Sequence, residues 1–561
     1  MSRSSQPKKK TPPRPPAPNT GRRGAARASD LRGGAVPART TPTATAETVP
    51  TSAAPPPPKN PARWCYVDIG VVRIQTWIDR TPRLRFRRGA SNLLFDLTSR
   101  STVESYLPQG VLWNTEAGER SGVVTLKVDG SDAEAARRRA LDVAVLVAQH
   151  LRRAAPALEL VAYFGIAGTY AAADMDPAKR LVNGDMLLDL PALPADAVVV
   201  KPCDECRSSA AERSPITVAQ ESKSLCRDCR SRLESAGATS AADVERRPVS
   251  QSQLEEDLRR LLGADVSSVT TPIDFAALAA MVEHRQAFDA STQIATITAD
   301  GNRIGDFMAQ LRGKLDEQEM TTAIARAARS VVAAGAAELL RRDPQLTDPH
   351  GAVSLPVIAH YVGGDDIVVS VAADDAWAFV TTMCGRFAGA IRDELKSAKA
   401  GVTLPTLSAG MVFHHKSQPL PDVLAKAHDH LSLAKNSTRG DGASVSFLDL
   451  TADGDRAVGD RAFTVEELTT RAGQLDRVSR IPAAQRTQLL TLLRECDDPA
   501  YRSDDVEPPE EALERRLGTM RIPVLMEIAP DGDSGRQSRV ALRRALDVAR
   551  WWRPVRVEET A

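Results

Sequence analysis

The sequence predicts an α+β protein with two separate sheets, each covered by helices on one face. The first observation is a β-α-β-α-β series of apolar strands and helical stretches over residues 64–165. The second is a strand, a helix and a β-hairpin, in that order, over residues 293–371. The third is a pair of Cys-x2-Cys motifs between the two series. With 561 residues, the chain is long enough for three or four domains.

Basic and acidic residues nearly balance, at 73 Lys/Arg and 72 Asp/Glu, but they are unevenly distributed. Residues 1–60 hold 11 Lys/Arg and only 2 Asp/Glu, so the positive excess belongs to this segment. It is rich in Pro, Ala, Thr, Ser and Gly and has no hydrophobic period, so we expect it to be disordered. Its charges have two interpretations, a solvated tail or a non-specific contact with nucleic acid.

The remaining composition indicates a cytoplasmic protein with no membrane partner. No apolar run reaches the roughly 18 residues that a bilayer span needs. The N-terminus lacks the apolar core of a signal peptide. Four of the seven cysteines form Cys-x2-Cys pairs, which in that compartment indicate metal binding rather than disulfides. We expect the other three, Cys65, Cys384 and Cys496, to be buried apolar residues.

Order is predicted to begin at a strand over Trp64–Gly70, followed by a helix from Val72 to about Asp79. Residues 80–88 then hold five arginines, which either contact RNA phosphate or form a solvated face. No hairpin tip with paired acids occurs in this part of the chain, so we expect it to lack metal chemistry. Its further predicted elements are a strand over 122–128, a helix over 133–154 and a strand over 158–165.

The two Cys-x2-Cys motifs are Cys203 with Cys206 and Cys226 with Cys229, separated by 19 residues. This spacing is typical of a tetrahedral zinc site. Four cysteines fill every position around the metal, so we expect Zn²⁺ to stabilise a small module rather than to catalyse. The polar residues that follow contain one predicted helix, at Leu254–Leu262.

A strand over 293–299 ends at Asp300 and Gly301, and a helix containing Phe307 and Leu311 follows. A strand that ends in Asp-Gly before a helix suits a metal-bound triphosphate. The carboxylate holds the cation, and the N–H groups of the turn and helix hold the phosphates. An ordinary Asp-Gly turn explains these residues equally well.

The most informative stretch is Gly363-Gly364-Asp365-Asp366, between apolar runs at 355–359 and 367–371. It predicts a hairpin with a tight Gly-Gly turn. Two adjacent aspartates at a hairpin tip repel each other, and a divalent cation would offset the repulsion. Together with Asp300 on a neighbouring strand, they suit Mg²⁺ or Mn²⁺ carrying nucleotide phosphates. An ordinary Gly-Asp hairpin is the alternative.

Helices and strands continue after the hairpin. A helix over Asp422–Ala434 ends at Lys435, which either complements the helix dipole or reaches a triphosphate. The final segment has an apolar helical stripe that includes Leu468, Leu475 and Leu489, either as the core of an independent domain or as a docking face for another subunit. The other predicted elements are helices over 321–341 and 374–398 and strands over 407–413 and 444–449.

These motifs together resemble one family, the large "Cas ten" subunit of type III CRISPR effector complexes. The resemblance covers about residues 64–510 and includes a first palm, the four-cysteine module and a helical C-terminal region. It rests on Thr298-Ala299-Asp300-Gly301-Asn302-Arg303-Ile304-Gly305, on Tyr361-Val362-Gly363-Gly364-Asp365-Asp366, on Ser408-Ala409-Gly410 and on Ala434-Lys435-Asn436.

The resemblance implies two ferredoxin-like palms of the nucleotide cyclase and polymerase type. It implies that Asp300 and Asp365 ligate Mg²⁺ or Mn²⁺, that Asp366 assists as ligand or base, and that Lys435 holds the triphosphate of ATP. Ser408 would contact the nucleotide base. Gly301, Gly363 and Gly364 would complete the nucleotide-binding residues.

By the same resemblance, the protein converts ATP into cyclic oligoadenylate after its complex binds target RNA. A ribose hydroxyl attacks an α-phosphate in line, pyrophosphate leaves, and two metal ions flank the transfer. The implied partners are guide RNA, target RNA and the other effector subunits, including a small helical subunit. The predicted domains are a basic tail (1–60), a non-catalytic first palm (61–200), a zinc module with a helical linker (201–272), a catalytic second palm (273–455) and a helical C-terminal domain (456–561).

Two features depart from the family pattern. Asn302 stands where many relatives carry a second acid. Residues 1–60 contain no histidine and show no HD nuclease domain, so we expect no cleavage of single-stranded DNA. His428 and Asp429 lie within a predicted helix, where we expect them to face solvent.

Two further functions are compatible with these motifs. The first is a standalone GGDD nucleotide cyclase or polymerase that needs no guide RNA. The second is a non-catalytic scaffold whose palms bind nucleotide or RNA. The intact Gly363–Asp366 motif favours catalysis, because a scaffold has no need for two juxtaposed charges. Asn302 favours the scaffold.

Overall fold

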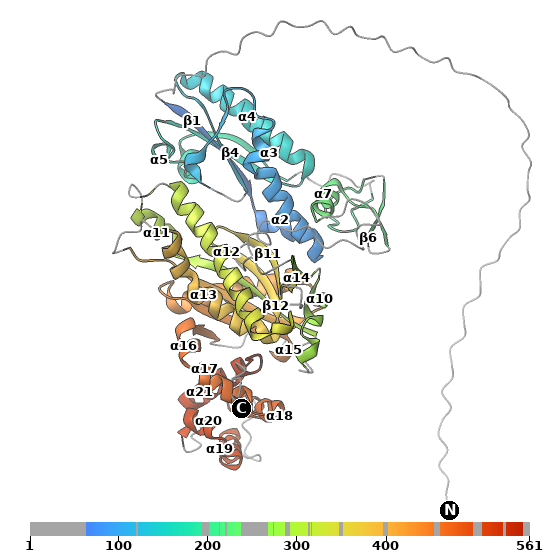
Figure 1. The fold of residues 1–561 in the computed structure, drawn as a ribbon, viewed down its shortest axis with the longest axis vertical. Helices are drawn as coiled ribbons and strands as arrows, with labels where there is room; N and C mark the ends of the chain where they lie inside the picture. Colours follow the sequence, from blue (N-terminus) through green and yellow to red (C-terminus); the bar gives the residue numbers. More distant parts are fainter. Residues whose placement is uncertain are drawn as a thin grey trace, which may run out of the picture. The chain divides into compact units, whose positions relative to one another are not determined.

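The computed structural model describes residues 63–118, 122–192, 201–212, 214–218, 221–236, 268–272, 274–285, 292–311, 315, 317–346, 352–395, 402–453, 461–497, 508–530 and 535–553 (Figure 1). The predicted tail over 1–60 and the predicted helix at Leu254–Leu262 lie outside these residues. The predicted α+β class is confirmed: two sheets carry packed helices, and a four-cysteine cluster lies between them in the chain.

In the described residues, the first palm sheet has five strands in the order β2-β3-β1-β4-β5, all antiparallel. The central strand β1 (Trp64–Val72) is largely buried along its length. Helix α4 (Ala133–Ala154) begins where Asp132 accepts two backbone N–H bonds, and its buried residues recur at helical spacing. The other elements are α1 (Ile74–Asp79), α2 (Leu84–Thr98), α3 (Arg100–Glu104), β2 (Leu112–Trp113), η1 (Thr115–Ala117), β3 (Val123–Asp129), β4 (Glu159–Ala167), α5 (Tyr170–Ala173), α6 (Pro177–Val182) and β5 (Met186–Leu190).

The second palm sheet has, in the described residues, six strands in the order β11-β12-β9-β13-β14-β15. Residues Ala295, Ile297 and Ala299 of β9 point into the core that α12 and α13 share. Their neighbours Thr296 and Thr298 point to the opposite face, as strand alternation requires. The elements are β9 (Gln293–Asn302), α11 (Ile304–Leu311), α12 (Glu317–Arg342), η4 (Pro344–Leu346), β10 (Ala352–Ser354), β11 (Val357–Gly363), β12 (Asp366–Ala372), η5 (Ala373–Asp375), α13 (Ala376–Glu394), β13 (Thr406–His415), α14 (Leu420–Thr438), β14 (Ser444–Asp449), α15 (Leu450–Asp453) and β15 (Ala462–Thr464).

The two palms share one local junction after their central strands. Arg73 follows β1 with φ 53°, and Arg303 follows β9 with φ 56°. Each arginine directly precedes an isoleucine that starts a helix, α1 or α11. The helix predicted from Val72 therefore starts two residues later, at Ile74, because β1 continues through Val72 and Arg73 turns the chain.

The arginines over 80–88 bind partners inside the protein. Arg87 and Arg88 are 1% and 3% exposed; Arg87 pairs with Asp79, and Arg88 donates to Thr271 and the Pro272 carbonyl. Arg80 donates to Ser209 at 2.9 Å, and Arg83 lies 3.6 Å from Glu205. These contacts join residues 80–88 to α1, the cysteine module and the linker, and burial makes the solvated-face interpretation wrong for Arg87 and Arg88. The elements there are β6 (Ile216–Val218), β7 (Glu221–Lys223), α7 (Arg227–Ser235), β8 (Ser268–Thr270), α10 (Phe275–Ala280) and η2 (Glu283–Arg285).

The C-terminal helices share a core with the second palm. Leu468, Leu475 and Leu489 of the predicted stripe are buried in the same apolar cluster as Trp377. Trp551 packs on Phe413 and donates to Asp449 at 2.8 Å. These residues of the stripe therefore extend the core of the second palm and form neither the core of an independent domain nor a docking face. The helices are α16 (Val465–Thr470), α17 (Ala472–Ser479), α18 (Ala483–Asp497), α19 (Pro509–Met520), α20 (Pro523–Ile528) and α21 (Arg536–Ala549).

Two buried histidines form a polar chain on the second sheet. His414 Nδ1 donates to the His415 carbonyl, so its Nε2 accepts from Thr296 Oγ1 at 2.8 Å. Thr296 also contacts Ser370, which contacts His360. Burial lowers the pKa of His414 from 6.5 to about 4, since protonation would charge a group away from water and remove the acceptor for Thr296.

We expect this histidine to make the second palm acid-sensitive. A pKa that is lower in the folded than in the unfolded chain contributes stability above pH 6.5, which is lost as the pH falls toward 4. For His414 alone, the loss between pH 7 and pH 5 is about 2 kcal/mol. Urea unfolding at the two pH values should show a smaller loss for His414→Gln than for the wild type. His428→Gln, at an exposed position on α14, is the matched control. An equal loss in all three proteins would contradict the assignment.

No helix in the described part of the chain is both long and apolar enough to cross a membrane.

Candidate functional site

The Gly363–Asp366 motif forms the tip of the β11–β12 hairpin. Gly363 pairs with Asp366 across the hairpin, so the turn residues are Gly364 and Asp365 rather than the predicted Gly-Gly pair. Gly364 has φ +63°, which fits a hairpin turn whose first central residue must be glycine. A Cβ at Gly363 would lie 2.4 Å from the Tyr361 hydroxyl. The backbone therefore favours glycine at Gly364, and a side chain at Gly363 would displace the Tyr361 ring.

Asp300 lies near the end of β9, beside β12 on one edge and β13 on the other. Its neighbour Gly301 brings it close to the hairpin: a Cβ at Gly301 would lie 2.8 Å from Asp365 Oδ2. The close packing therefore places the Asp365 carboxylate over the backbone of Gly301. The predicted convergence of Asp300 with the hairpin tip is present in the structure.

Lys435 reaches the same place from α14. Its Nζ bonds Asp300 Oδ2 and lies 3.1 Å from the Gly301 carbonyl. Helix α14 crosses β13 at Gly410, where a Cβ would lie 2.0 Å from the Ala427 carbonyl oxygen. The missing side chain of Gly410 thus lets α14 approach the sheet closely. Lys435 lies within α14, which continues to Thr438, so it does not end the helix as predicted.

The three carboxylates interact electrostatically. Burial, and then the charge of Asp300, raise the pKa of Asp366 to about 6. The same two causes raise the pKa of Asp365. Lys435 opposes both shifts but does not cancel them. A cluster of carboxylates that resist ionisation together is a candidate binding place for a cation, which would remove the repulsion.

Ser408 and Asn302 lie beside this cluster but inside the protein. Ser408 is fully buried, and its hydroxyl contacts Asn302 Nδ2 and Ser444 Oγ at 2.9 Å each. Asn302 is 2% exposed and also donates to Thr406 and the Gly442 carbonyl. In this arrangement, the Ser408 hydroxyl supports the ends of β9 and β14 and does not face open space.

One residue at the cluster has no counterpart among the predicted site residues. Gln75, in the first turn of α1, donates from Nε2 to Asp366 Oδ2 at 3.2 Å. The first palm thus contributes a direct contact to the acidic hairpin of the second. One feature of the sequence points to Gln75: it stands two residues after Arg73 in the junction that both palms share, as Gly305 stands two residues after Arg303.

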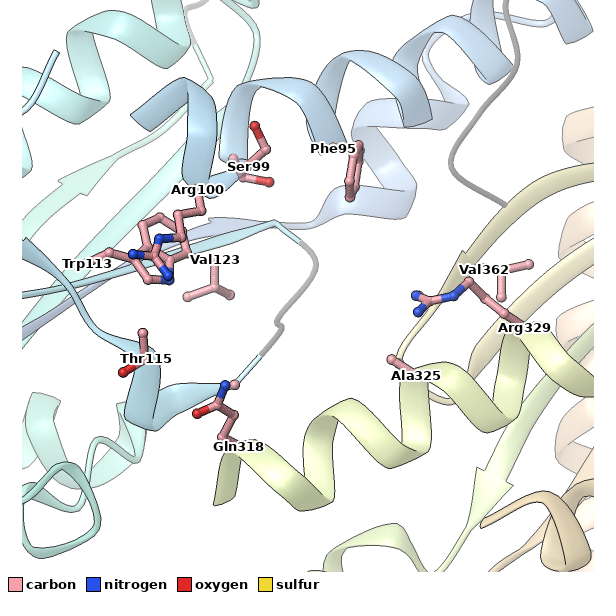
Figure 2. A pocket seen from close by; sticks show the side chains of 14 residues that line it. Phe95, Ser99, Arg100, Trp113, Thr115, Val123, Gln318, Ala325, Arg329 and Val362 are labelled. Carbon is pink, nitrogen blue, oxygen red and sulfur yellow. The ribbon is translucent and has the colours of Figure 1, made fainter. Parts of the chain in front are cut away.

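A cavity of about 310 Å³ borders the hairpin turn on the side of α12 (Figure 2). Figure 2 shows Phe95, Arg100 and Trp113 on one side, and Arg329 and Val362 on the other. Helix α12 packs on the core face of the sheet, whereas Lys435 and α14 lie on the opposite face. The lining of the cavity includes Gly363 and Gly364 of the hairpin but none of the three aspartates.

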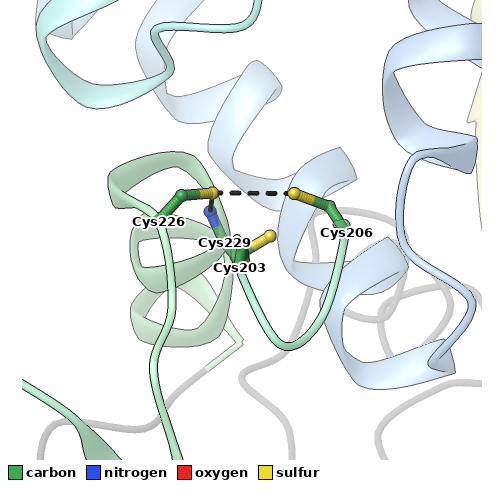
Figure 3. A group of neighbouring side chains, drawn as sticks. All are labelled: Cys203, Cys206, Cys226 and Cys229. Carbon is green, nitrogen blue, oxygen red and sulfur yellow. Dashed lines mark hydrogen bonds between the residues drawn. The ribbon is translucent and has the colours of Figure 1, made fainter. Parts of the chain in front are cut away.

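The four cysteines converge as predicted. All are buried, and their Sγ atoms lie within 4.8 Å of one another (Figure 3). The Sγ atoms of Cys206 and Cys226 are 3.8 Å apart, which equals the edge of a tetrahedron with metal–sulfur bonds of about 2.3 Å. The residues therefore fit a structural Zn²⁺ ion. Among the described residues, these four cysteines are the group of His, Cys, Asp or Glu side chains whose ligand atoms lie close enough together to hold one metal ion. In the acidic cluster, Asp300 is paired with Lys435.

The two sheets have a palm-like topology, and the second carries the acidic hairpin. Residues 293–443 match the family model described as Cas10/Cmr2, second palm domain. The match spans β9 to α14, so this part of the chain is a palm domain of the Cas10/Cmr2 type.

The chain is also similar to proteins of known structure. It is similar to a Csm1–Csm4 cassette in complex with pppApA, with 11% identity over 88% of this chain and 70% of that chain and a TM-score of 0.47. Csm1 of T. onnurineus is 12% identical over 86% of this chain and 70% of that chain, with a TM-score of 0.44. A Csm1–Csm4 cassette in complex with AMPPNP is 13% identical over 87% of this chain and 70% of that chain, with a TM-score of 0.43. No curated protein matches the sequence.

Proposed function

We propose that this chain is a metal-dependent synthase of cyclic oligoadenylate that uses ATP and is activated by RNA within a type III effector complex. One observation carries the proposal: Asp300, Asp365 and Asp366 converge at the tip of a palm hairpin, with Lys435 beside them. The match of residues 293–443 to a Cas10/Cmr2 second palm domain supports it.

In this proposal, Asp300, Asp365 and Asp366 hold Mg²⁺ or Mn²⁺. The ions would supply charge neutralisation for in-line attack of a ribose hydroxyl on an α-phosphate, with pyrophosphate leaving. Asp366 would assist either as a further ligand or as the base that accepts the proton of the attacking hydroxyl.

The remaining residues act on the triphosphate in the proposal. Lys435 neutralises Asp300 in the structure, so a cation taken up by Asp300 would free the ammonium group for a phosphate oxygen. Gly301, Gly363 and Gly364 lie beside the aspartates and would complete the nucleotide-binding residues of the proposal. Ser408 would act through Asn302, by fixing the end of β9, rather than by contacting the base.

The partners in the proposal are guide RNA, target RNA and the other subunits of the effector complex, including a small helical subunit. The arginines over 80–88, for which the sequence allowed a contact with RNA phosphate, do not support RNA binding in this proposal, because Arg87 and Arg88 are buried. RNA dependence therefore has to be tested on the assembled complex.

The test is to incubate the purified chain and the assembled complex with labelled ATP and Mn²⁺, with and without target RNA. We expect pyrophosphate release and oligoadenylate formation by the complex when target RNA is present. Unchanged ATP under all conditions, with Asp365→Ala indistinguishable from the wild type, would contradict the proposal. Turnover by the lone chain would favour a standalone cyclase, and ATP binding without turnover would favour a scaffold.

A further inference from the structure

The contact between Gln75 and Asp366 joins the first palm to the acidic hairpin of the second. Gln75 Nε2 lies 3.2 Å from Asp366 Oδ2, and both side chains are partly buried. The two residues are 291 positions apart in the chain. A hydrogen bond to a carboxylate fixes the direction in which its oxygens point. Gln75 is therefore placed to orient Asp366.

Helix α1, which carries Gln75, cannot hold this position by itself. It has six residues, and no side chain caps its N-terminus. A helix this short is unstable without tertiary contacts. Its buried residues are Trp77 and Ile78, which are 3% and 1% exposed. The contacts of these two residues decide where Gln75 lies.

Those contacts come from α7 of the cysteine module. Arg232 is fully buried and donates to the carbonyl oxygens of Trp77 at 2.7 Å and Ile78 at 3.2 Å. These carbonyl groups lie at the end of α1, where backbone partners become incomplete, and the Trp77 carbonyl also accepts from the Arg80 N–H at 3.4 Å. The Arg232 guanidinium also lies 4.2 Å from the centre of the Trp77 ring. Asp228 accepts from Trp77 Nε1 at 3.1 Å and from Arg232 Nε at 2.9 Å.

Helix α7 is in turn fixed at its start by the cysteine cluster. Cys226 is its N-cap and accepts from the backbone N–H of Cys229, so two of the four predicted zinc ligands flank Asp228. At its other end, α7 touches α2: a Cβ at Gly89 would lie 1.8 Å from the Arg232 carbonyl oxygen. The module therefore has little freedom to move relative to α1.

We propose that Gln75 is a positioning residue for Asp366, and that the cysteine module holds α1, through Asp228 and Arg232, in the place where Gln75 reaches the hairpin. This proposal rests on the proposed function in one respect, the role of Asp366 at a metal–nucleotide site. Its physical content is a connected set of contacts from the cysteines to the hairpin. A substitution at Trp77 that displaces α1 should therefore move Gln75 and change the orientation of the Asp366 carboxylate.

The test uses the full chain with Gln75→Ala, Trp77→Phe and the double variant, and Thr76→Ala as control. Trp77→Phe keeps an aromatic ring but removes the bond to Asp228, and Thr76 is exposed on the same helix. Mn²⁺ affinity is measured by electron paramagnetic resonance with a non-hydrolysable ATP analogue. We expect Gln75→Ala to weaken Mn²⁺ binding about tenfold and Trp77→Phe about threefold, with Thr76→Ala unchanged. Zinc content and melting temperature of Gln75→Ala should equal those of the wild type.

The double variant separates a positioning role from a general structural one. If Trp77 acts through Gln75, the double variant should match Gln75→Ala alone, whereas independent effects would multiply. Multiplied effects, or wild-type Mn²⁺ binding by Gln75→Ala, would overturn the proposal.

A second readout does not depend on metal or activity. Hydrogen–deuterium exchange of residues 361–368 should be faster in Gln75→Ala and in Trp77→Phe than in the wild type and Thr76→Ala. If the wild type binds no Mn²⁺, the proposed function fails, and this exchange measurement still decides whether α1 restrains the hairpin. Equal exchange in all variants would then overturn the inference.

Discussion

Asp365→Asn is expected to lower metal-dependent ATP turnover by about 10³-fold or more, without lowering the stability of the folded protein. Asp365 is the turn residue of the hairpin, and its carboxylate lies over Gly301, beside Asp300. Burial, and secondly the charge of Asp300, raise the pKa of Asp365. Replacing the carboxylate by the amide of Asn therefore removes repulsion in the metal-free protein. We therefore expect the variant to melt at the wild-type temperature or slightly above it.

Loss of activity without loss of stability distinguishes a metal ligand from a structural residue. Pyrophosphate release and thermal unfolding should be measured on the same preparations. Asp429→Asn, with the same charge change at an exposed position on α14, is the control and should keep wild-type turnover. Wild-type turnover by Asp365→Asn would exclude Asp365 as a ligand.

Cys229→Ser is expected to remove the bound zinc and unfold the cysteine module. Four buried thiolates without a metal would repel one another, and zinc binding in small modules contributes roughly 10 kcal/mol or more to folding. The loss should extend to α7, because Cys229 lies in its first turn and donates its N–H to Cys226.

Elemental analysis and limited proteolysis test this expectation. The wild type should carry one zinc per chain, and Cys229→Ser should carry none and be cleaved within residues 201–236. Cys496→Ser changes a buried cysteine of the C-terminal helices and should keep its zinc. Stoichiometric zinc in Cys229→Ser would show that the cluster has another role.

The sequence was sufficient for features that are local or carried by a motif. The cysteine spacing predicts the cluster, apolar runs predict β1 and β9, and the helix over Ala133–Ala154 has the predicted bounds. The hairpin followed from its two glycines and the apolar runs on either side, although the turn lies one residue later than predicted. The convergence of Asp300 with the hairpin followed from the order of strand, helix and hairpin.

Features set by tertiary packing could not be read from the sequence. Burial of Arg87 and Arg88 depends on the cysteine module and the linker folding over α2. The contact of Gln75 with Asp366 depends on how the two palms pack. The charge of Lys435 alone could not decide between a role at the helix dipole and a role at a triphosphate. Its pairing with Asp300 depends on the close approach of α14 to β13, which Gly410 permits.

The most direct measurement of the proposed metal–nucleotide site is an Mn²⁺ titration of the full chain with a non-hydrolysable ATP analogue, followed by electron paramagnetic resonance. Two Mn²⁺ ions should bind per wild-type chain at the acidic hairpin. The double variant Asp300→Asn/Asp365→Asn should bind neither ion at the same concentrations. Equal Mn²⁺ stoichiometry in the two proteins would contradict the assignment of the hairpin as a metal site.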